Sequence, residues 1–373
     1  MRRLAAVLVP IVLLPVGLMA CASAAAPARP AEPPKVAAAA GPTAAPATTA
    51  ASEQQAVADF YRRKTVRIVV GYAAGGAFDV HARVVARHLS QYIPGNPSVI
   101  VENRPGAGGI LAANLVYASE AKDGTVMTPI GAGLPLQQAI GKEGIQFDAA
   151  RFNWLAAGGM ATTTCVARAD TGVRSVQDLI DGTELITGAI GPGTPNYDIP
   201  AVLNIAIGTR FKVVSGYESG AKALAAAEAG EVNGACPGFD TMTGRPYLFD
   251  GPDPPLRAIL VMGGGATDSP WLKDVPTVES LARTDEARQL IQAISTEVYP
   301  YYSYAAAPEI PADRLTALRK ALMDTFNDPE FKAEAEKIGA IVSPTPGEEV
   351  ARIYRQVLAT PPGALAKLRE VLK

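Results

Sequence analysis

Short apolar segments that stop at glycines, each followed by a helical pattern, constrain the fold of this chain most. Residues 66–70, 98–101 and 125–130 are rich in β-branched residues, and each segment runs into glycine. Between them, residues 80–92 and 110–121 carry apolar side chains at helical spacing. This alternation of strand, glycine loop and helix predicts a parallel α/β sheet. Ligands of such sheets bind at the carboxyl ends of the strands.

The same pattern recurs later with different residues, which predicts a second α/β lobe. Its strands are expected at residues 162–167, 185–187, 211–214 and 232–236, with helices at 197–207 and 220–229. A Pro/Gly-rich crossing then leads to one more strand at 257–262 and a mostly helical remainder. We expect lobe 1 to comprise residues 56–160 and 245–373, and lobe 2 to comprise 161–244. The predicted fold is α/β, with two lobes joined by a hinge and a ligand cleft between them.

The first residues have the form of an export signal. Two arginines precede an uncharged apolar stretch at residues 4–19, a pattern typical of signal peptides and too short to span a bilayer. We predict a signal peptide at 1–20. The following Cys21 favours lipidation, as in bacterial lipoproteins, and cleavage after the small residues 22–24 is the alternative. Residues 21–55 are mostly alanine, proline and threonine, which predicts a disordered tether.

The remaining cysteines leave two interpretations open. With Cys21 used for lipid, Cys165 and Cys236 are left over. They could pair in an oxidising compartment, and they could equally be two small buried hydrophobic residues, the interpretation we prefer.

Composition argues against nucleic acid, and motifs argue against catalysis. The net charge is −2 without a basic stripe, whereas a phosphate backbone requires clustered lysine and arginine. The only histidines, His81 and His88, lie two helical turns apart, too far to share a metal. No nucleophile elbow, Walker motif or ordered dinucleotide fingerprint occurs. We therefore predict no catalytic residue, no metal and no cofactor. Both histidines are expected to be partly exposed helix residues, and ligand contact by His81 in the first turn after the loop is the alternative.

The glycine loops offer backbone amides instead. Glycines at a strand-to-helix turn let the chain approach a ligand, and the first N–H groups of a helix favour anions. The loop from Gly71 to Asp79 has this form, with Asp79 placed to cap the helix. Gly193 and Thr194 repeat it in the second lobe. Tight packing of strand on helix explains either loop alone, but two facing loops favour anion binding.

At these loops the sequence resembles the substrate-binding receptors of tripartite tricarboxylate transporters, the Bug family of bacterial periplasmic proteins. The resemblance extends over nearly all of the chain after Val66. It is carried by residues 68–79 (IVVGYAAGGAFD), 101–109 (VENRPGAGG), 122–125 (KDGT), 191–194 (GPGT), 216–220, 230–232, 274–277 (DVPT) and 327–330 (NDPE).

The resemblance implies a type II periplasmic-binding-protein fold that closes around its ligand by hinge motion. It also implies that backbone amides, hydroxyls and waters hold a ligand carboxylate. Carried over by position, the ligand-binding residues are Tyr72, Ala73, Ala74, Gly75, Gly76, Ala77, Phe78 and Asp79 in lobe 1, Gly191, Gly193 and Thr194 in lobe 2, and Tyr217, Gly131 and Gly133 as pocket walls. The loop departs from the family's usual Pro-Gly-Gly-Gly pattern at Ala74 and Ala77, so the sequence does not specify which carboxylate is bound.

The functional hypothesis is an extracytoplasmic solute-binding protein for a small organic acid. We expect it to be periplasmic and monomeric, to serve the permease subunits of a tripartite tricarboxylate transporter, and to touch the membrane only through a lipid on Cys21. Two alternatives stay open: an exported hydrolase or redox enzyme on the same architecture, and a tethered ligand sensor.

Overall fold

The computed structural model describes residues 47–264 and 269–372. The predicted signal peptide, Cys21 and most of the predicted tether lie outside the described residues. The tether prediction is wrong at its end, because helix α1 (Ala47–Tyr61) begins inside it. Val57 and Tyr61 of this helix are buried in the first-lobe core, so apolar burial stabilises a segment whose local composition indicated disorder.

The first sheet has six strands in the order β11-β4-β10-β3-β1-β2. The parallel part is β1 (Thr65–Val70), β2 (Ser98–Asn103) and β3 (Val126–Ile130), as the sequence predicts. The antiparallel part is β10 (Tyr301–Ala306), β4 (Asn153–Gly159) and β11 (Val342–Pro346). β4 was not predicted, because its alanines and glycines have little β propensity. Six of its seven residues are buried, which shows that packing decides its conformation.

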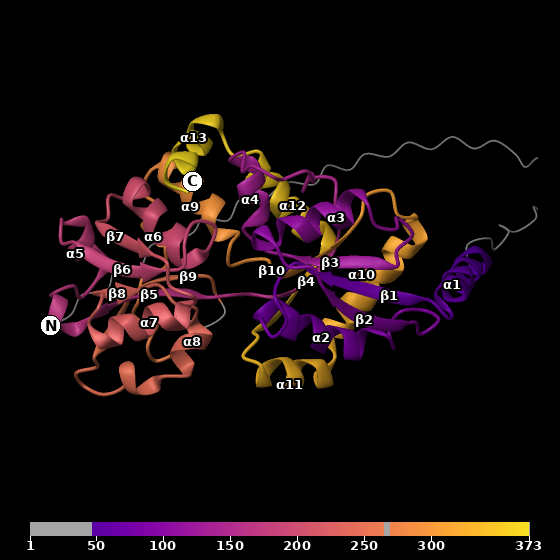
Figure 1. Cartoon of the computed structure of the whole chain (residues 1–373), viewed down its shortest axis with the longest axis horizontal. Helices are drawn as coiled ribbons and strands as arrows, with labels where there is room; N and C mark the ends of the chain where they lie inside the picture. Colours follow the sequence, from indigo (N-terminus) through magenta and orange to yellow (C-terminus); the bar gives the residue numbers. More distant parts are fainter. Residues whose placement is uncertain (1–46, 265–268, 373) are drawn as a thin grey trace, which may run out of the picture. The chain divides into compact units, whose positions relative to one another are not determined.

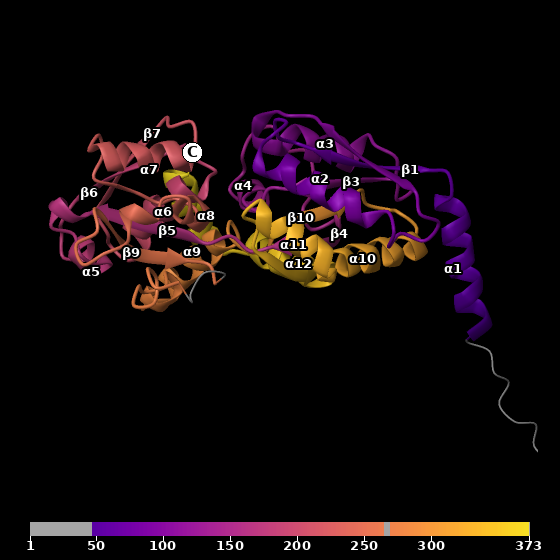
Figure 2. The same ribbon diagram turned by 90° about the horizontal axis from the view of Figure 1, so that it is seen from below.

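Helices pack on this sheet (Figures 1 and 2). They are α2 (Ala77–Leu89), the 3-10 turn η1 (Ala107–Gly109), α3 (Ile110–Ala118), α4 (Leu134–Ala139), α10 (Ala312–Asn327), α11 (Pro329–Lys337) and α12 (Gly347–Leu358). The core between α2, α10 and the strands is aromatic and aliphatic, with Phe326 and Phe331 fully buried.

The second sheet has the order β7-β6-β8-β5-β9. β6 (Leu185–Ala189) runs parallel to β7 (Phe211–Ser215) and β8 (Gly234–Ala235), while β5 (Thr163–Arg168) is antiparallel to β8 and β9 (Leu256–Met262). Its helices are α5 (Val176–Ile180), α6 (Pro195–Ala206), α7 (Gly220–Ala229), α8 (Phe239–Thr243) and α9 (Asp285–Ser295), with short 3-10 turns η2 (Ala169–Thr171), η3 (Pro246–Leu248) and η4 (Glu279–Leu281).

The second lobe is larger than predicted. Strand β9 was assigned to lobe 1, but it pairs with β5 over its whole length. Helix α9 packs against α6, and the last helix, α13 (Pro362–Val371), returns to the same cluster, where Leu368 is fully buried. The chain therefore re-enters lobe 1 only after α9, and leaves it again after α12. Strand propensity alone does not reveal which sheet a strand joins.

A disulfide joins Cys165 on β5 to Cys236 just after β8, with the Cα atoms 3.9 Å apart. Our preferred interpretation, two separate buried thiols, is therefore wrong. The bond links the neighbouring antiparallel strands β5 and β8, so it fixes the segment that leads from β8 into α8.

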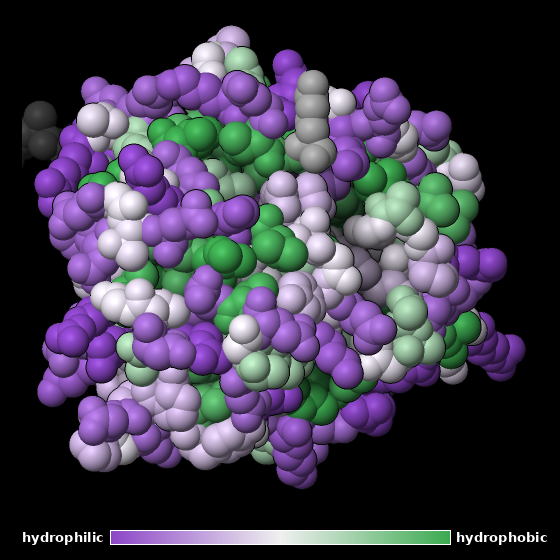
Figure 3. All heavy atoms as spheres, turned by 60° about the vertical axis from the view of Figure 1, so that its left-hand side comes forward, coloured by the Kyte–Doolittle hydropathy of each residue, from purple (hydrophilic) through white to green (hydrophobic). Residues whose placement is uncertain are grey.

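The described helices give no membrane-spanning segment, because none of them is both long and apolar enough. On the face shown in Figure 3, hydrophobic residues form separate patches between hydrophilic ones.

Replacing both cysteines by alanine should destabilise the second lobe. The disulfide closes a segment with a sequence separation of 71 residues, and the loss of such a constraint typically costs about 2–5 kcal/mol. Urea unfolding of wild type and of Cys165→Ala/Cys236→Ala will measure it. A reductant should lower the urea midpoint of wild type toward that of the variant. Identical midpoints in all three samples would contradict the prediction.

Candidate functional site

A cavity of about 420 Å³ is lined by both lobes. The first lobe contributes Ala77 from α2, Tyr301 and Tyr302 from β10, and residues 339–341 before β11. The second lobe contributes Ile190, Pro195, Asn196, Ser219, Gly220, Ala221, Phe239, Asp240 and Thr241, and residues 160–163 and Cys236 also border the cavity. Lysine, arginine and histidine do not occur in this described lining, and Asp240 is its one charged side chain.

Three longer helices begin at this cavity, and so does the five-residue α8, whose first residue is Phe239. Ala77 is the first residue of α2, Pro195 the first of α6 and Gly220 the first of α7. The first N–H groups of a helix have no partner inside the helix, and they carry the positive end of its dipole. The dipoles of these helices therefore favour negative charge in this part of the cavity without any basic side chain.

Asn196 adds a side-chain donor to these amides. Its side chain is buried, and its Oδ1 accepts hydrogen bonds from the Ile190 N–H and the Thr194 hydroxyl, at 3.2 and 2.8 Å. Its Nδ2 therefore points away from that loop, toward Gly220, and has no hydrogen-bond partner among the described residues. The buried Thr162 hydroxyl at the same cavity is also unpaired within the described chain. These unused donors suit an anion.

Asp79 holds the first-lobe loop in place rather than facing the cavity. Its carboxylate accepts hydrogen bonds from the Gly75 N–H at 2.8 Å, from Asn103 at 2.8 Å and from Arg83 at 3.0 Å. Burial would raise the pKa of Asp79, but the hydrogen bonds from Arg83, Gly75 and Asn103 outweigh burial and lower the pKa to about 2. Ala73, Ala74 and Gly75 are exposed, Gly76 is half-buried, and Ala77 is the one loop residue in the cavity lining.

Tyr72 and Phe78 form a layer behind the cavity. Their rings stack with centroids 4.4 Å apart, and Phe78 meets Tyr302 edge-on at 5.2 Å. The Tyr72 hydroxyl lies against Gly131, where a Cβ would come within 2.2 Å of it. Gly131 therefore allows Tyr72 to reach its position, and both residues support the cavity without lining it.

The second-lobe loop uses its own donors internally. The Gly193 N–H donates to Asp198 at 2.9 Å, and the single proton of the Thr194 hydroxyl is shared between the Gly191 carbonyl at 2.5 Å and Asn196 Oδ1 at 2.8 Å. Gly193 lies against Gln137 of α4 in the first lobe, because a Cβ there would come within 2.3 Å of the Gln137 amide. Four residues of lobe 2 were predicted to bind ligand. Three of them, Gly191, Gly193 and Thr194, instead support the loop that orients Asn196.

Tyr217 and Gly133 also lie away from the cavity. The Tyr217 ring packs against Gly188 and Ala223, inside the lobe. Gly133 faces Glu297, whose carboxyl would be 3.5 Å from a Cβ at that position. The sequence analysis missed Asn196, Thr162 and Ser219. Ser219 was detectable, since a serine before an alanine-rich helix indicates an N-cap, and its hydroxyl accepts from the Lys222 N–H.

Asp198 and Glu297 form a buried pair of carboxyls where α6 meets the segment leading back to lobe 1. Both side chains are 2% exposed. Burial raises the pKa of Glu297 well above its usual value, and the neighbouring Asp198 raises it further. Burial therefore favours the protonated form of Glu297, whose Oε2 has no hydrogen-bond partner among the described residues. Asp198 accepts the Gly193 N–H and so supports the loop that orients Asn196.

The two histidines contact neighbouring side chains within the protein. His81 is fully buried, so the prediction of partial exposure is wrong for this residue. It stacks on Tyr302 with ring centroids 3.8 Å apart and lies 3.1 Å from the Tyr304 hydroxyl. Burial lowers its pKa to about 3, so it is neutral at physiological pH. His88 pairs with Glu334 at 2.8 Å. Within the described ranges, no cluster of three potential ligand residues could hold a metal ion.

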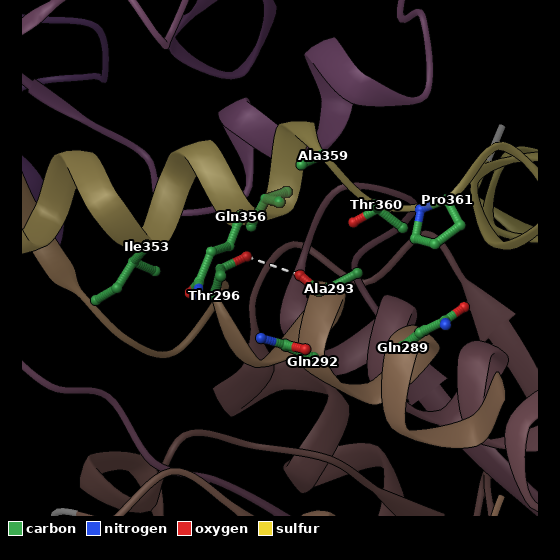
Figure 4. Close-up of a pocket in the computed structure, with 10 residues that line it drawn as sticks. Gln289, Gln292, Ala293, Thr296, Ile353, Gln356, Ala359, Thr360 and Pro361 are labelled. Atoms are coloured by element: carbon green, nitrogen blue, oxygen red, sulfur yellow. Dashed lines mark hydrogen bonds between the residues drawn. The ribbon is translucent and has the colours of Figure 1, made fainter. Parts of the chain in front are cut away.

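A second hollow of about 300 Å³ lies between α9 and α12 (Figure 4). Its polar side chains are three glutamines and two threonines, and Thr296 already donates to the Ala293 carbonyl at 2.7 Å. It contains none of the predicted site residues and none of the described side-chain atoms that are buried without a partner. The cavity between the lobes is therefore the better candidate.

Comparisons with known proteins identify the family of the chain. The family model described as "Tripartite tricarboxylate transporter family receptor" matches residues 81–345. A UPF0065 protein of Cupriavidus necator is 29% identical over 233 residues, which cover 61% of this chain and 67% of that protein.

Solved structures share the fold. A TctC solute binding protein from Polaromonas, without ligand, has a TM-score of 0.64 at 17% identity, covering 83% of this chain and 99% of that one. The R. palustris protein Rpa4515 with adipate has a TM-score of 0.57 at 21% identity, covering 83% of this chain and 98% of that one. At these identities the likeness concerns the two-lobe architecture.

Asp79→Asn should destabilise the first lobe at neutral pH. The folded-state pKa of about 2 lies below the ordinary 3.8, so the ionised carboxylate contributes about 2 kcal/mol above pH 4, and this contribution disappears as pH falls toward 2. Urea unfolding across that range will measure it. The difference in free energy of unfolding between wild type and Asp79→Asn should disappear in acid. The control is Asp285→Asn, at an 88% exposed carboxylate, which should change stability little at any pH.

Glu297→Gln should change the response to alkaline pH. The folded wild type holds a proton that the unfolded chain has released, so its stability falls as pH rises, by up to about 1.4 kcal/mol per pH unit for one proton. Glutamine keeps a donor toward Asp198 but has no proton to lose. In urea unfolding between about pH 5 and 8, the stability of Glu297→Gln should therefore depend less on pH than that of wild type, and it should be higher at pH 8. The exposed Glu286→Gln is the control, and parallel curves for Glu297→Gln and wild type would refute a raised pKa of Glu297.

Proposed function

We propose that this chain, which belongs to the tripartite tricarboxylate transporter receptor family, captures a small organic carboxylate and delivers it to the permease subunits of such a transporter. Receptors of this family bind and release solutes in the periplasm. The chain's task is therefore reversible binding without chemical conversion of the ligand. The same membership argues against an exported enzyme.

The observation that carries the carboxylate assignment is the set of unused donors at one cavity. The N-termini of α2, α6 and α7 line it together with the Nδ2 of Asn196. A carboxylate accepts several hydrogen bonds at once, and helix N-termini bind anions through dipole and amides together. The adipate in the R. palustris relative fits the same chemistry.

In the proposed complex, one ligand carboxylate lies between Ala77 and Gly220. The first-turn amides of α2 and α7 approach it from opposite lobes, and Asn196 donates from the side. The hydroxyls of Thr162 and Ser219 complete the ring of donors. Tyr72, Phe78 and Asp79 hold the first-lobe loop in position, as the Gly191–Thr194 loop holds Asn196.

Ligand binding would couple to a hinge motion. Donors from both lobes contact one carboxylate, so the full set of hydrogen bonds to the ligand forms only when the two lobes are close together. We propose that the ligand favours a closed form and that the permease recognises this form. Lipid on Cys21 would keep the receptor at the membrane, with the residues before α1 acting as a tether.

Asn196→Asp should abolish carboxylate binding while preserving the loop. Aspartate keeps the oxygen that accepts from Ile190 and Thr194, but it replaces the free donor by a negative oxygen. We expect the affinity to fall by about 100-fold or more, as removal of a charge-assisted hydrogen bond plus like-charge repulsion would cause. Isothermal titration with succinate, malate, adipate and monocarboxylates will measure it.

Asn204→Asp is the matched control on the same helix. Its amide donates to the Phe211 carbonyl at 2.8 Å, inside the lobe, so this variant should lose stability and keep affinity. Equal affinity of Asn196→Asp and wild type would remove Asn196 from the site. Absence of binding of every carboxylate to wild type would refute the proposed function.

A further inference from the structure

We infer that the cavity has a cation-binding half around Asp240, so that the preferred ligand is a zwitterion with a carboxylate at one end and an ammonium group at the other. The inference rests on the proposed function, because the helix N-termini supply the carboxylate half. It goes further by assigning the opposite charge to the rest of the ligand, and it names Asp240 as the residue that determines specificity.

Asp240 is the unpaired charge of the cavity. It lies in the first turn of α8, is exposed, and lines the cavity. In the part of the chain that the structure describes, no hydrogen bond or ion pair engages its carboxylate. Other carboxylates near the lobe surfaces do have partners, as Glu228 has in Arg245 and Tyr247. A charge that both faces a binding cavity and lacks a partner is available to a ligand.

The position of Asp240 places this charge between the lobes. A Cβ on Gly339, in the first lobe, would lie 3.8 Å from the Cβ of Asp240. The disulfide at Cys236, four residues earlier, fixes the segment that carries it. A ligand group beside Asp240 would therefore contact both lobes, as the carboxylate does at the other helix N-termini.

Aromatic rings surround this part of the cavity. Phe239, Tyr301 and Tyr302 line it together with Asp240, and the rings of Tyr301 and Tyr302 meet at 4.6 Å. Burial and, to a smaller extent, the charge of Asp240 together raise the pKa of Tyr301 to about 12, so this phenol stays neutral. Aromatic faces attract ammonium groups, and a carboxylate beside them adds a charged partner.

A dicarboxylate fits this arrangement poorly. With one carboxylate at the helix N-termini, its second would enter the half that holds Asp240 and no basic side chain, where like charges repel. The alternative role for Asp240 is to stabilise the start of α8 through the helix dipole. That role predicts an effect on stability alone, whereas the proposed role predicts a change of ligand preference.

The test uses pairs of ligands matched in length: 4-aminobutyrate with succinate, 5-aminopentanoate with glutarate, and 6-aminohexanoate with adipate. Isothermal titration of the full mature chain is done with each compound and with the corresponding monocarboxylates. In the pair that fits the cavity, wild type should bind the amino acid about 10-fold or more tighter than the dicarboxylate. Asp240→Asn should bind the amino acid about 10-fold more weakly than wild type does, and it should bind the dicarboxylate more tightly.

Asp253→Asn, at an exposed aspartate that does not line the cavity, is the control and should leave both affinities unchanged. Tighter binding of dicarboxylates or monocarboxylates to wild type would overturn the inference and leave the proposed function intact. Preference for amino acids that survives in Asp240→Asn would overturn the role of Asp240. Failure of every acid in the series to bind would count against the proposed function itself.

Discussion

Three helices that begin at one cavity are the constraint on which the rest of the site depends. The first amides of α2, α6 and α7 cannot be satisfied inside their helices, so the protein must either fill the space between them with its own acceptors or leave it for a ligand. It uses both solutions. Thr194 and Ser219 accept amides of the first turns of α6 and α7. Asp79 and Asp198 take the amides of Gly75 and Gly193 in the preceding loops, while the Nδ2 of Asn196 at the cavity has no partner among the described residues.

This arrangement explains why the chain needs no arginine or lysine at the cavity. A basic side chain would bind a carboxylate strongly, but it would also be costly to desolvate in a closed cleft. Fixed backbone dipoles carry only partial charges and are already oriented, so they hold an anion without a large reorganisation. Reversible capture suits a receptor that must later release its ligand.

Much of the fold could be predicted from the sequence, because strands ending in glycine and helices with apolar faces are local signals. β1, β3 and β6 follow that pattern closely. What could not be predicted depends on partners far away in the chain. β4 is a strand only because it lies between β10 and β11, and β9 carries no local mark of the sheet it joins. The site followed the same rule: the glycine loops were evident, whereas the orientation of Asn196 depends on two hydrogen bonds made after folding.

The return of α13 to the second lobe has a consequence for the order of assembly. Leu368 and Leu372 complete a core that also contains Cys165 and Val176, about 200 residues earlier. A chain synthesised from its N-terminus cannot complete that core until residues 368–372 have left the ribosome. The first lobe also depends on late residues, because β10 and β11 belong to its sheet. Both cores are therefore completed only after most of the chain has been synthesised.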